Sequence, residues 1–227
     1  MPNIKLTAED GHTLDAYVAE PANPNGHAVV IAQEIFGVNK HIRDVADDYA
    51  KEGYWAIAPA LFDRVRPGIE LGYGPEDMQE GMKIRAAIST DDAVIDVAAA
   101  LDAAAKKVGA KERVAVVGYC WGGTLAWLAA TRLAPGAAVG YYGGMIAKFV
   151  SEEPECAVML HFGKLDAHIP ESEINKIRQQ HPKVPIFMYD AGHGFNCDMR
   201  KDFEPKSAAL AKQRTLEFLK QHLAGSL

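Results

Sequence analysis

Short apolar runs alternate along the chain with longer amphipathic stretches. Ala28–Ala32 (AVVIA) is apolar at every position, which is typical of a strand buried on both faces of a parallel sheet. The same reasoning predicts strands at Ile4–Thr7, Leu14–Ala19, Ala28–Ala32, Trp55–Pro59, Arg113–Val117, Ala137–Tyr142, Val158–Phe162 and Pro185–Tyr189. Amphipathic spacing predicts helices at His41–Glu52, Asp91–Ala105, Gly123–Thr131, Ser172–Gln180 and Lys206–Leu223.

Strands that alternate with helices predict an α/β fold, with a mostly parallel sheet and helices on both of its faces. The first two strands flank the turn Glu9–Gly11, so we expect them to form an antiparallel edge. A length of 227 residues fits one domain of this class, and we expect residues 1–227 to form a single domain.

Residues 61–85 interrupt this alternation. The first part, Leu61–Gly81, is rich in glycine, proline and charged residues. A long irregular stretch inside a compact domain often serves as a binding loop or lid. We therefore predict a lid-like or substrate-facing segment at 61–85, without a separate cap domain.

The charge balance argues against a nucleic-acid partner. Lys and Arg number 24 against 30 Asp and Glu, giving a net charge of −6, whereas phosphate binding needs a basic face. No apolar run reaches about 18 residues, the length at which a membrane helix is suspected. Met1–Gly11 has neither the basic start nor the apolar centre of a signal peptide. We expect a small-molecule substrate, no membrane partner and a cytoplasmic location.

The three cysteines, Cys120, Cys156 and Cys197, form neither a disulfide framework nor a CxxC zinc motif. Free thiols fit a reducing compartment. The cysteine spacing therefore gives no indication of a zinc site.

The strongest motif is Gly118–Gly123 (GYCWGG), which lies between a predicted strand and a predicted helix. It matches a G-x-S-x-G nucleophile elbow with cysteine in place of serine. Small residues two positions before and after Cys120 avoid a Cβ clash in so tight a turn. The N-terminus of the following helix favours a thiolate at Cys120. A phosphate-binding loop is the alternative, but the glycine spacing does not match its motifs.

Candidates for the acid and the base follow Cys120 in the order that this elbow requires. Asp166 lies in the loop after Val158–Phe162, and His193 lies between glycines in the loop after Pro185–Tyr189. The carboxyl ends of parallel strands meet at one edge of a sheet, where catalytic groups gather. We therefore predict that Cys120, His193 and Asp166 act together. Asp190 is a rival acid, but it is better placed to shape the histidine loop.

A further carboxylate, Glu34, follows the first fully apolar strand. Because Ile35 and Phe36 come next, we expect the Glu34 carboxylate to be partly desolvated and its pKa to be raised, as suits proton transfer. The alternative is a carboxylate that only orders its loop. The backbone N–H groups of Ile35 and Trp121 are the predicted oxyanion-hole donors, each worth about 3–4 kcal/mol in the transition state.

The segments around Glu34, Cys120, Asp166 and His193 resemble the dienelactone hydrolase family over nearly the whole chain. The resemblance implies an α/β-hydrolase fold and a Cys-His-Asp triad that cleaves a small ester or lactone without metal or cofactor. Carboxymethylenebutenolidase activity is one such reaction. It also implies that Glu34 contacts a protonated thiol in the resting enzyme and takes its proton when substrate binds.

The expected substrate pocket departs from the best-known family members, which hold a substrate carboxylate with two arginines. Cys197 and, by approximate alignment, Met78 occupy those positions here. A more apolar pocket favours a less charged ester or lactone. Arg64, Arg85 or Arg200 could replace the two missing arginines as the group that binds a substrate carboxylate. The predicted substrate-binding residues are Phe36, Met78, Met82, Arg85, Phe195 and Cys197.

Two other functions fit parts of the pattern. One is a non-catalytic module on a hydrolase scaffold, since fold alone does not fix function. The other is a redox sensor in which Cys197 resolves an oxidised Cys120. For the assembly state we expect a monomer or a weak homo-oligomer.

Overall fold

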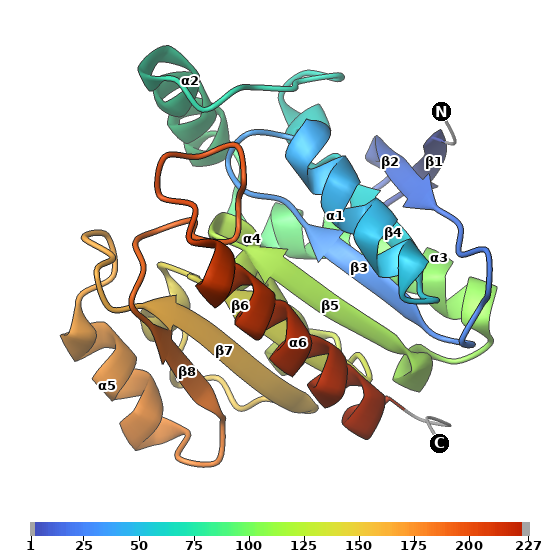
Figure 1. The fold of residues 1–227 in the computed structure, drawn as a ribbon. Coiled ribbons are helices and arrows are strands. Elements are labelled where there is room, and N and C mark those ends of the chain that lie inside the picture. The colour runs from blue at the N-terminus through green and yellow to red at the C-terminus, as the bar shows by residue number, and fades with distance from the viewer. Residues whose placement is uncertain (1–2, 224–227) are drawn as a thin grey trace.

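An eight-stranded sheet forms the centre of the protein, in the order β1-β2-β4-β3-β5-β6-β7-β8 (Figure 1). The structure is a computed structural model that describes residues 3–223. β1 and β2 run antiparallel to each other, as do β2 and β4, and every neighbouring pair from β4 to β8 is parallel. The predicted α/β fold with an antiparallel N-terminal edge is thus confirmed. The strands are β1 (Asn3–Thr7), β2 (Thr13–Ala19), β3 (Ala28–Ala32), β4 (Trp55–Pro59), β5 (Val114–Tyr119), β6 (Ala137–Tyr141), β7 (Ala157–Gly163) and β8 (Ile186–Tyr189).

Helices cover both faces of the sheet (Figure 1). α1 and α6 pack on one face, against β2 to β4 and against β6 and β7 respectively, whereas α3 and α4 pack on the other. The helices are α1 (Lys40–Lys51), α2 (Pro75–Ala86), α3 (Thr90–Val108), α4 (Trp121–Arg132), α5 (Glu171–Gln180) and α6 (Pro205–His222), with 3-10 turns η1 (Leu61–Arg64), η2 (Lys111–Arg113) and η3 (Ile146–Lys148).

Capping residues explain where the longest helix, α3, begins and ends. The side chain of Ser89 accepts a hydrogen bond from the backbone N–H of Asp92, which is the usual N-cap arrangement. Gly109 follows the helix with φ of +88°, a left-handed conformation that glycine adopts without steric cost.

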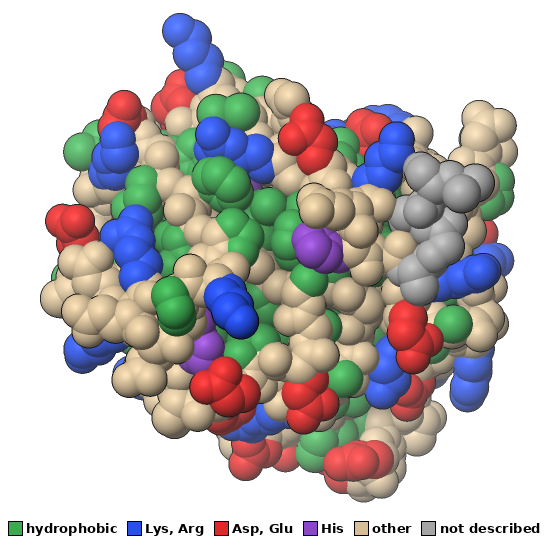
Figure 2. Space-filling model, turned by 90° about the horizontal axis from the view of Figure 1, so that it is seen from below, with side chains coloured by type: hydrophobic (Ala, Val, Ile, Leu, Met, Phe, Trp, Pro, Cys, Tyr) green, Lys and Arg blue, Asp and Glu red, His purple; other side chains and the backbone are tan. Residues whose placement is uncertain are grey.

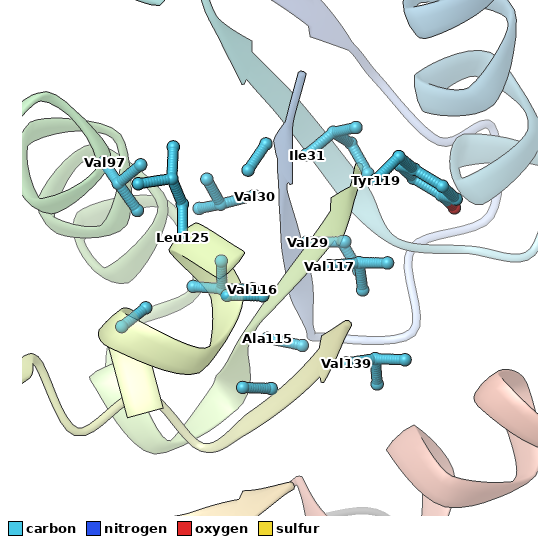
Figure 3. Packing of buried hydrophobic residues seen from close by; sticks show 14 of the residues in the cluster. Val29, Val30, Ile31, Val97, Ala115, Val116, Val117, Tyr119, Leu125 and Val139 are labelled. Atoms are coloured by element: carbon cyan, nitrogen blue, oxygen red, sulfur yellow. The ribbon is translucent and has the colours of Figure 1, made fainter. Parts of the chain in front are cut away.

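The core lies on both sides of the central strands (Figure 3). Val30 and Val116 point toward α3 and α4, where Val97 and Leu125 meet them, whereas Val117 points to the opposite face. These side chains are at most 1% exposed. Burial of each contributes about 1.5–3 kcal/mol, so packing on both faces stabilises the strands β3 and β5 that lead into the site.

The segment at 61–85 is more regular than the sequence suggested. It contains η1, an irregular stretch at 65–74 and the helix α2, so the prediction of an irregular chain as far as Gly81 was wrong. Gly74 and Pro75 are a helix-start signal, with proline at the first helical position. The apolar residues of α2 show little helical periodicity, so the sequence pattern does not predict a helix there despite this signal.

A glycine in the middle of α2 reveals how this helix is placed. A Cβ on Gly81 would lie 2.0 Å from the carbonyl oxygen of Ile35. The helix therefore packs directly on the loop that follows β3. Residues 61–85 are predicted to face a substrate, and this contact places α2 at the carboxyl end of β3.

The surface carries charges of both signs. On the face that Figure 2 shows, Lys and Arg side chains are interspersed with Asp and Glu. Within residues 3–223, none of the helices combines the length and the apolar character needed to cross a bilayer.

Candidate active site

Cys120 occupies a strained turn between β5 and α4. Its φ is +56°, which is rare for a residue with a side chain and is typical of a functional turn. A Cβ on Gly118 would lie 1.7 Å from the carbonyl oxygen of Gly122, and one on Gly122 would lie 2.1 Å from that of Ala32. Both glycines are therefore required by backbone contact, as the elbow motif predicts.

A chain of hydrogen bonds runs from the Cys120 sulfur into the protein. The Sγ atom of Cys120 lies 3.2 Å from Nε2 of His193, and Nδ1 of His193 lies 2.7 Å from Oδ2 of Asp166. The side chains of His193 and Asp166 are 11% and 1% exposed. The second oxygen of Asp166 accepts the backbone N–H of His168 at 2.8 Å, which fixes the carboxylate plane. The structure thus brings the three predicted residues together.

Backbone contacts join the loops of the acid and the base. A Cβ on Gly163, the last residue of β7, would lie 2.2 Å from the carbonyl oxygen of Ala191. The backbone N–H of Leu165 donates to that same Ala191 oxygen at 3.1 Å. The pairing of β7 with β8 therefore continues into the loops that carry Asp166 and His193.

The electrostatics of this chain favour a charged imidazole. Burial alone would lower the pKa of His193, but the neighbouring Cys120 sulfur and the Asp166 carboxylate outweigh it and raise that pKa to about 10. A His193 paired with a Cys120 thiolate therefore keeps its proton at neutral pH and loses it only as the pH rises toward that value. This is the state needed to hold a thiolate and later to protonate a leaving group.

Glu34 lies beneath the site and is fully buried, more completely than the sequence suggested. One carboxylate oxygen accepts the Tyr73 hydroxyl at 3.2 Å, and the other lies 3.3 Å from Nη1 of Arg200. The Arg200 side chain is itself only 9% exposed. Sequence reasoning named Arg200 only as a possible substrate clamp and missed Tyr73, because neither position is marked by a motif.

The glycine after His193 makes room for Arg200. Gly194 has φ of +78°, and a Cβ there would lie 2.7 Å from the guanidinium carbon of Arg200. The guanidinium also lies over the ring of Phe36, 5.8 Å from its centroid. Arg200 thus packs between the His193 loop and the Glu34 loop.

The sulfur and Glu34 have different partners in this structure. Family resemblance implied that Glu34 contacts a protonated thiol at rest. Here Glu34 is bound by Tyr73 and Arg200, while the hydrogen bond of Cys120 Sγ is with His193. The contact between Glu34 and the thiol that the resemblance implies is therefore not among the hydrogen bonds of the described residues.

The amides predicted as oxyanion donors lie at the two loops that flank the sulfur. Trp121 is the first residue of α4, so its N–H has no acceptor within the helix. Ile35 lies in the turn after β3 and under α2. Within the described part of the chain, neither amide donates to a backbone oxygen.

The three arginines that could bind a substrate carboxylate differ in how far their donors are already occupied. Arg64 is bound by Asp96 and by Asp10, both at 2.7 Å, so its donors are occupied. Arg200 pairs with Glu34. Arg85 lies half-buried on α2, with Nη2 at 2.6 Å from the sulfur of Met145. A thioether is a weak acceptor, which leaves the Arg85 fork largely available.

The other predicted substrate-binding residues divide by exposure. Met78 is half-buried and Met82 is 59% exposed, both on α2. Phe36, Phe195 and Cys197 are at most 1% exposed. A substrate would meet these three only after a rearrangement, so in this structure they form the packed wall behind the site.

The buried position of Cys197 weakens the redox reading. Burial, followed by the nearby Glu34, raises the pKa of the Cys197 thiol to about 12. A resolving cysteine reacts as its thiolate. Very little Cys197 thiolate is present at neutral pH to attack an oxidised Cys120.

One group of side chains has the composition of a metal site. Among the described residues, ligand atoms of Glu34, His41 and Cys197 lie within 4.8 Å of one another, and all three residues are buried. None of them is Cys120, His193 or Asp166.

Comparisons with known proteins agree with one another. The model of the dienelactone hydrolase family matches residues 14–223. The chain is 37% identical to a "Putative carboxymethylenebutenolidase" of Synechocystis, covering 92% of both chains, and 34% identical to a carboxymethylenebutenolidase of Pseudomonas putida, covering 95% of this chain and 94% of that one. A crystal structure described as a "Putative Dienelactone Hydrolase" from Klebsiella pneumoniae superposes with a TM-score of 0.81 at 31% identity, covering 97% of this chain and 100% of that one.

Proposed function

The chain belongs to the dienelactone hydrolase family and is a hydrolase of that type, and on this premise we propose that it opens a small ester or lactone with Cys120 as nucleophile, His193 as base and acid, and Asp166 as the group that orients the imidazole. One observation carries the proposal. It is the continuous hydrogen-bond chain from Cys120 Sγ through His193 to Asp166, with distances of 3.2 and 2.7 Å.

The first half of the reaction forms a thioester. The Cys120 thiolate attacks the carbonyl carbon, and the amides of Ile35 and Trp121 bind the oxyanion of the tetrahedral intermediate. The intermediate collapses with cleavage of the carbon–oxygen bond, and the His193 imidazolium gives its proton to the leaving alkoxide. In a lactone that alkoxide stays attached to the acyl group, so the ring opens without loss of a fragment.

The second half regenerates the thiol site. Neutral His193 takes a proton from water, and the resulting hydroxide attacks the thioester carbonyl. The carbon–sulfur bond breaks, Cys120 leaves as a thiolate, and the acid is released. Asp166 keeps Nδ1 of His193 protonated throughout, so that Nε2 is the nitrogen that exchanges protons.

Glu34 completes the proposed machinery as the acceptor of the thiol proton. In this structure, where Cys120 is hydrogen-bonded to His193, the Glu34 carboxylate is bound by Tyr73 and Arg200. A neutral Glu34 would lose the charge that binds Arg200. In the proposed step Glu34 takes the thiol proton and passes it to His193, so that the Glu34 carboxylate again pairs with Arg200 and the imidazolium lies beside the Cys120 thiolate.

Arg85 is the proposed contact for a polar substituent of the substrate. It lies four residues after Gly81, hence on the same side of α2, which packs on the Ile35 loop. Its guanidinium reaches Met145 beyond the end of β6. Because relatives are named carboxymethylenebutenolidases, butenolide lactones are the first substrates to test.

Acyl trapping tests the proposal directly. A slowly hydrolysed aryl ester is expected to acylate Cys120, and peptide mass spectrometry locates the added mass. Cys156 and Cys197 are internal controls, because burial raises the pKa of each thiol to about 12, which leaves them largely protonated at pH 8. Labelling that is equal on all three cysteines would contradict a special role for Cys120, and labelling no faster than a free thiol would favour the non-catalytic module.

The Glu34–Arg200 pair gives a second prediction. Glu34→Gln leaves a buried guanidinium without its counter-charge, so we expect the free energy of unfolding to fall by about 3 kcal/mol and hydrolysis to slow. Urea unfolding and kcat/KM measure the two effects. The double variant Glu34→Gln with Arg200→Met is the control, because it removes the stranded charge and should recover stability without recovering rate. A double variant that regains the rate would show that Glu34 only neutralises Arg200.

A further inference from the structure

Three potential metal ligands, Glu34, His41 and Cys197, lie close together in the protein interior. Glu34 follows β3, His41 lies in the first turn of α1, and Cys197 lies in the loop between β8 and α6. A carboxylate oxygen, a ring nitrogen and a sulfur from these residues lie within 4.8 Å of one another. The residues are 0%, 3% and 0% exposed, respectively.

His41 carries an unexplained polar atom. Its Nε2 is buried and has no hydrogen-bond partner among the described residues. Its other nitrogen, Nδ1, lies 3.3 Å from Oδ1 of Asp198, whose side chain is 63% exposed. Buried polar atoms are nearly always satisfied. A carboxylate near the second ring nitrogen is a common neighbour of a metal-binding histidine.

We propose that Glu34, His41 and Cys197 bind a divalent cation of intermediate softness, with Zn²⁺ as the type ion. One nitrogen, one oxygen and one sulfur donor are the mixture that zinc accepts, and three protein ligands leave a position for water. Zinc–ligand distances of about 2.0–2.3 Å require ligand atoms within about 4 Å of one another, so the side chains must close by roughly 1 Å.

Arg200 makes this site conditional. Its guanidinium lies 3.3 Å from a carboxylate oxygen of Glu34, so a dication and Arg200 compete for the same carboxylate. The metal binds when Arg200 releases Glu34. Bound metal then keeps Glu34 from exchanging a proton, which makes the ion an inhibitor and not a cofactor. This inhibitory consequence rests on the proposed function, whereas the binding itself does not.

His41 also lines a cavity. It has a volume of about 300 Å³ and lies between α1 and the segment that leads into α6. Asp44, Asp48 and Asp198 line it together with Lys212 and His41. Carboxylates along such an opening raise the local concentration of a dication.

Equilibrium dialysis of Cys120→Ala protein against Zn²⁺ tests the binding. This background removes the Cys120–His193 pair, which is the competing place for zinc. We expect about one zinc per chain, and a marked loss of affinity in Cys197→Ser and in His41→Gln. Asp198→Asn alters only a mostly exposed side chain and should weaken binding about tenfold. Arg200→Met removes the competing cation and should tighten it.

Cobalt distinguishes the ligands by a second readout. Co²⁺ bound to the Cys120→Ala protein should give a sulfur-to-metal charge-transfer band that disappears in Cys197→Ser. Cys156→Ser is the matched control, since Cys156 lies outside the cluster, and it should keep the band. Absence of stoichiometric zinc, or binding that survives both Cys197→Ser and His41→Gln, would overturn the site.

The inhibitory consequence has its own measurement. Zn²⁺ should slow hydrolysis by the wild type, a chelator should restore it, and the ratio of rates with and without zinc should approach one in Cys197→Ser. Inhibition that persists in that variant would place zinc at Cys120 and His193 instead. If zinc binds in dialysis but Cys120→Ala still hydrolyses esters, the proposed function fails and the metal site stands. If the reverse is found, only the metal site fails.

Discussion

Cys120→Ala is expected to fold normally and to hydrolyse activated esters and lactones roughly 10⁴-fold more slowly than the wild type, or worse. The substitution removes the atom that forms the thioester, and no other thiol can replace it. Cys156 and Cys197 are held protonated by burial. Alanine has the same Cβ as cysteine, so the substitution adds no backbone strain at φ of +56°. Steady-state kinetics with circular dichroism as a folding check measures the effect.

Cys120→Ser is the matched control. A hydroxyl beside His193 keeps the hydrogen-bond chain but has a far higher pKa than a thiol, so we expect intermediate loss. Equal activity of wild type and Cys120→Ala would leave the triad without a nucleophile and would end the proposal. Equal loss in the alanine and serine variants would show that the site needs an ionised nucleophile at rest.

Gly118→Ala should have the largest effect on stability. The new Cβ would stand 1.7 Å from the carbonyl oxygen of Gly122, a backbone atom that cannot move without displacing α4. We expect a loss of about 3 kcal/mol or more in the free energy of unfolding, or failure to accumulate as soluble protein. Thermal or urea unfolding measures the loss, and any folded fraction should lack activity.

Gly144→Ala is the control at the same edge of the sheet. Its nearest neighbour would be a side-chain carbon of Ile169 at 3.7 Å, which is ordinary contact. We expect a change below about 1 kcal/mol. A Gly118→Ala protein as stable as Gly144→Ala would mean that the elbow is not held as tightly as the contacts imply.

The predictable part of the site lies where sequence and backbone geometry are linked locally. The glycines around Cys120 could be read because a strand–turn–helix leaves no space for side chains there. Asp166 and His193 could be placed because each follows an apolar strand, and parallel strands end at one edge. The alternation of strands and helices likewise predicts a mostly parallel sheet, which the structure confirms.

The remainder depends on contacts that leave no local pattern. Tyr73 lies in an irregular stretch, and Arg200 reaches Glu34 from 166 residues away. The sequence does not predict α2, because Pro75 after a glycine is its one strong helix signal and the residues around it are typical of a loop. The sequence does not predict the metal ligands, because two separate loops and helix α1 supply one each, whereas zinc motifs are recognised by short spacings.

The close approach of Gly163 to Ala191 has a mechanical consequence for the site. Backbone contacts at the β7–β8 border hold the loops of Asp166 and His193 together, so the separation of acid and base is fixed by the chain around them as well as by their own hydrogen bond. The distance from Cys120 to His193 depends instead on how the turn after β5 is placed relative to that border. A distant substitution that shifts β5 relative to β7 and β8 would therefore change reactivity by altering the distance between Cys120 and His193.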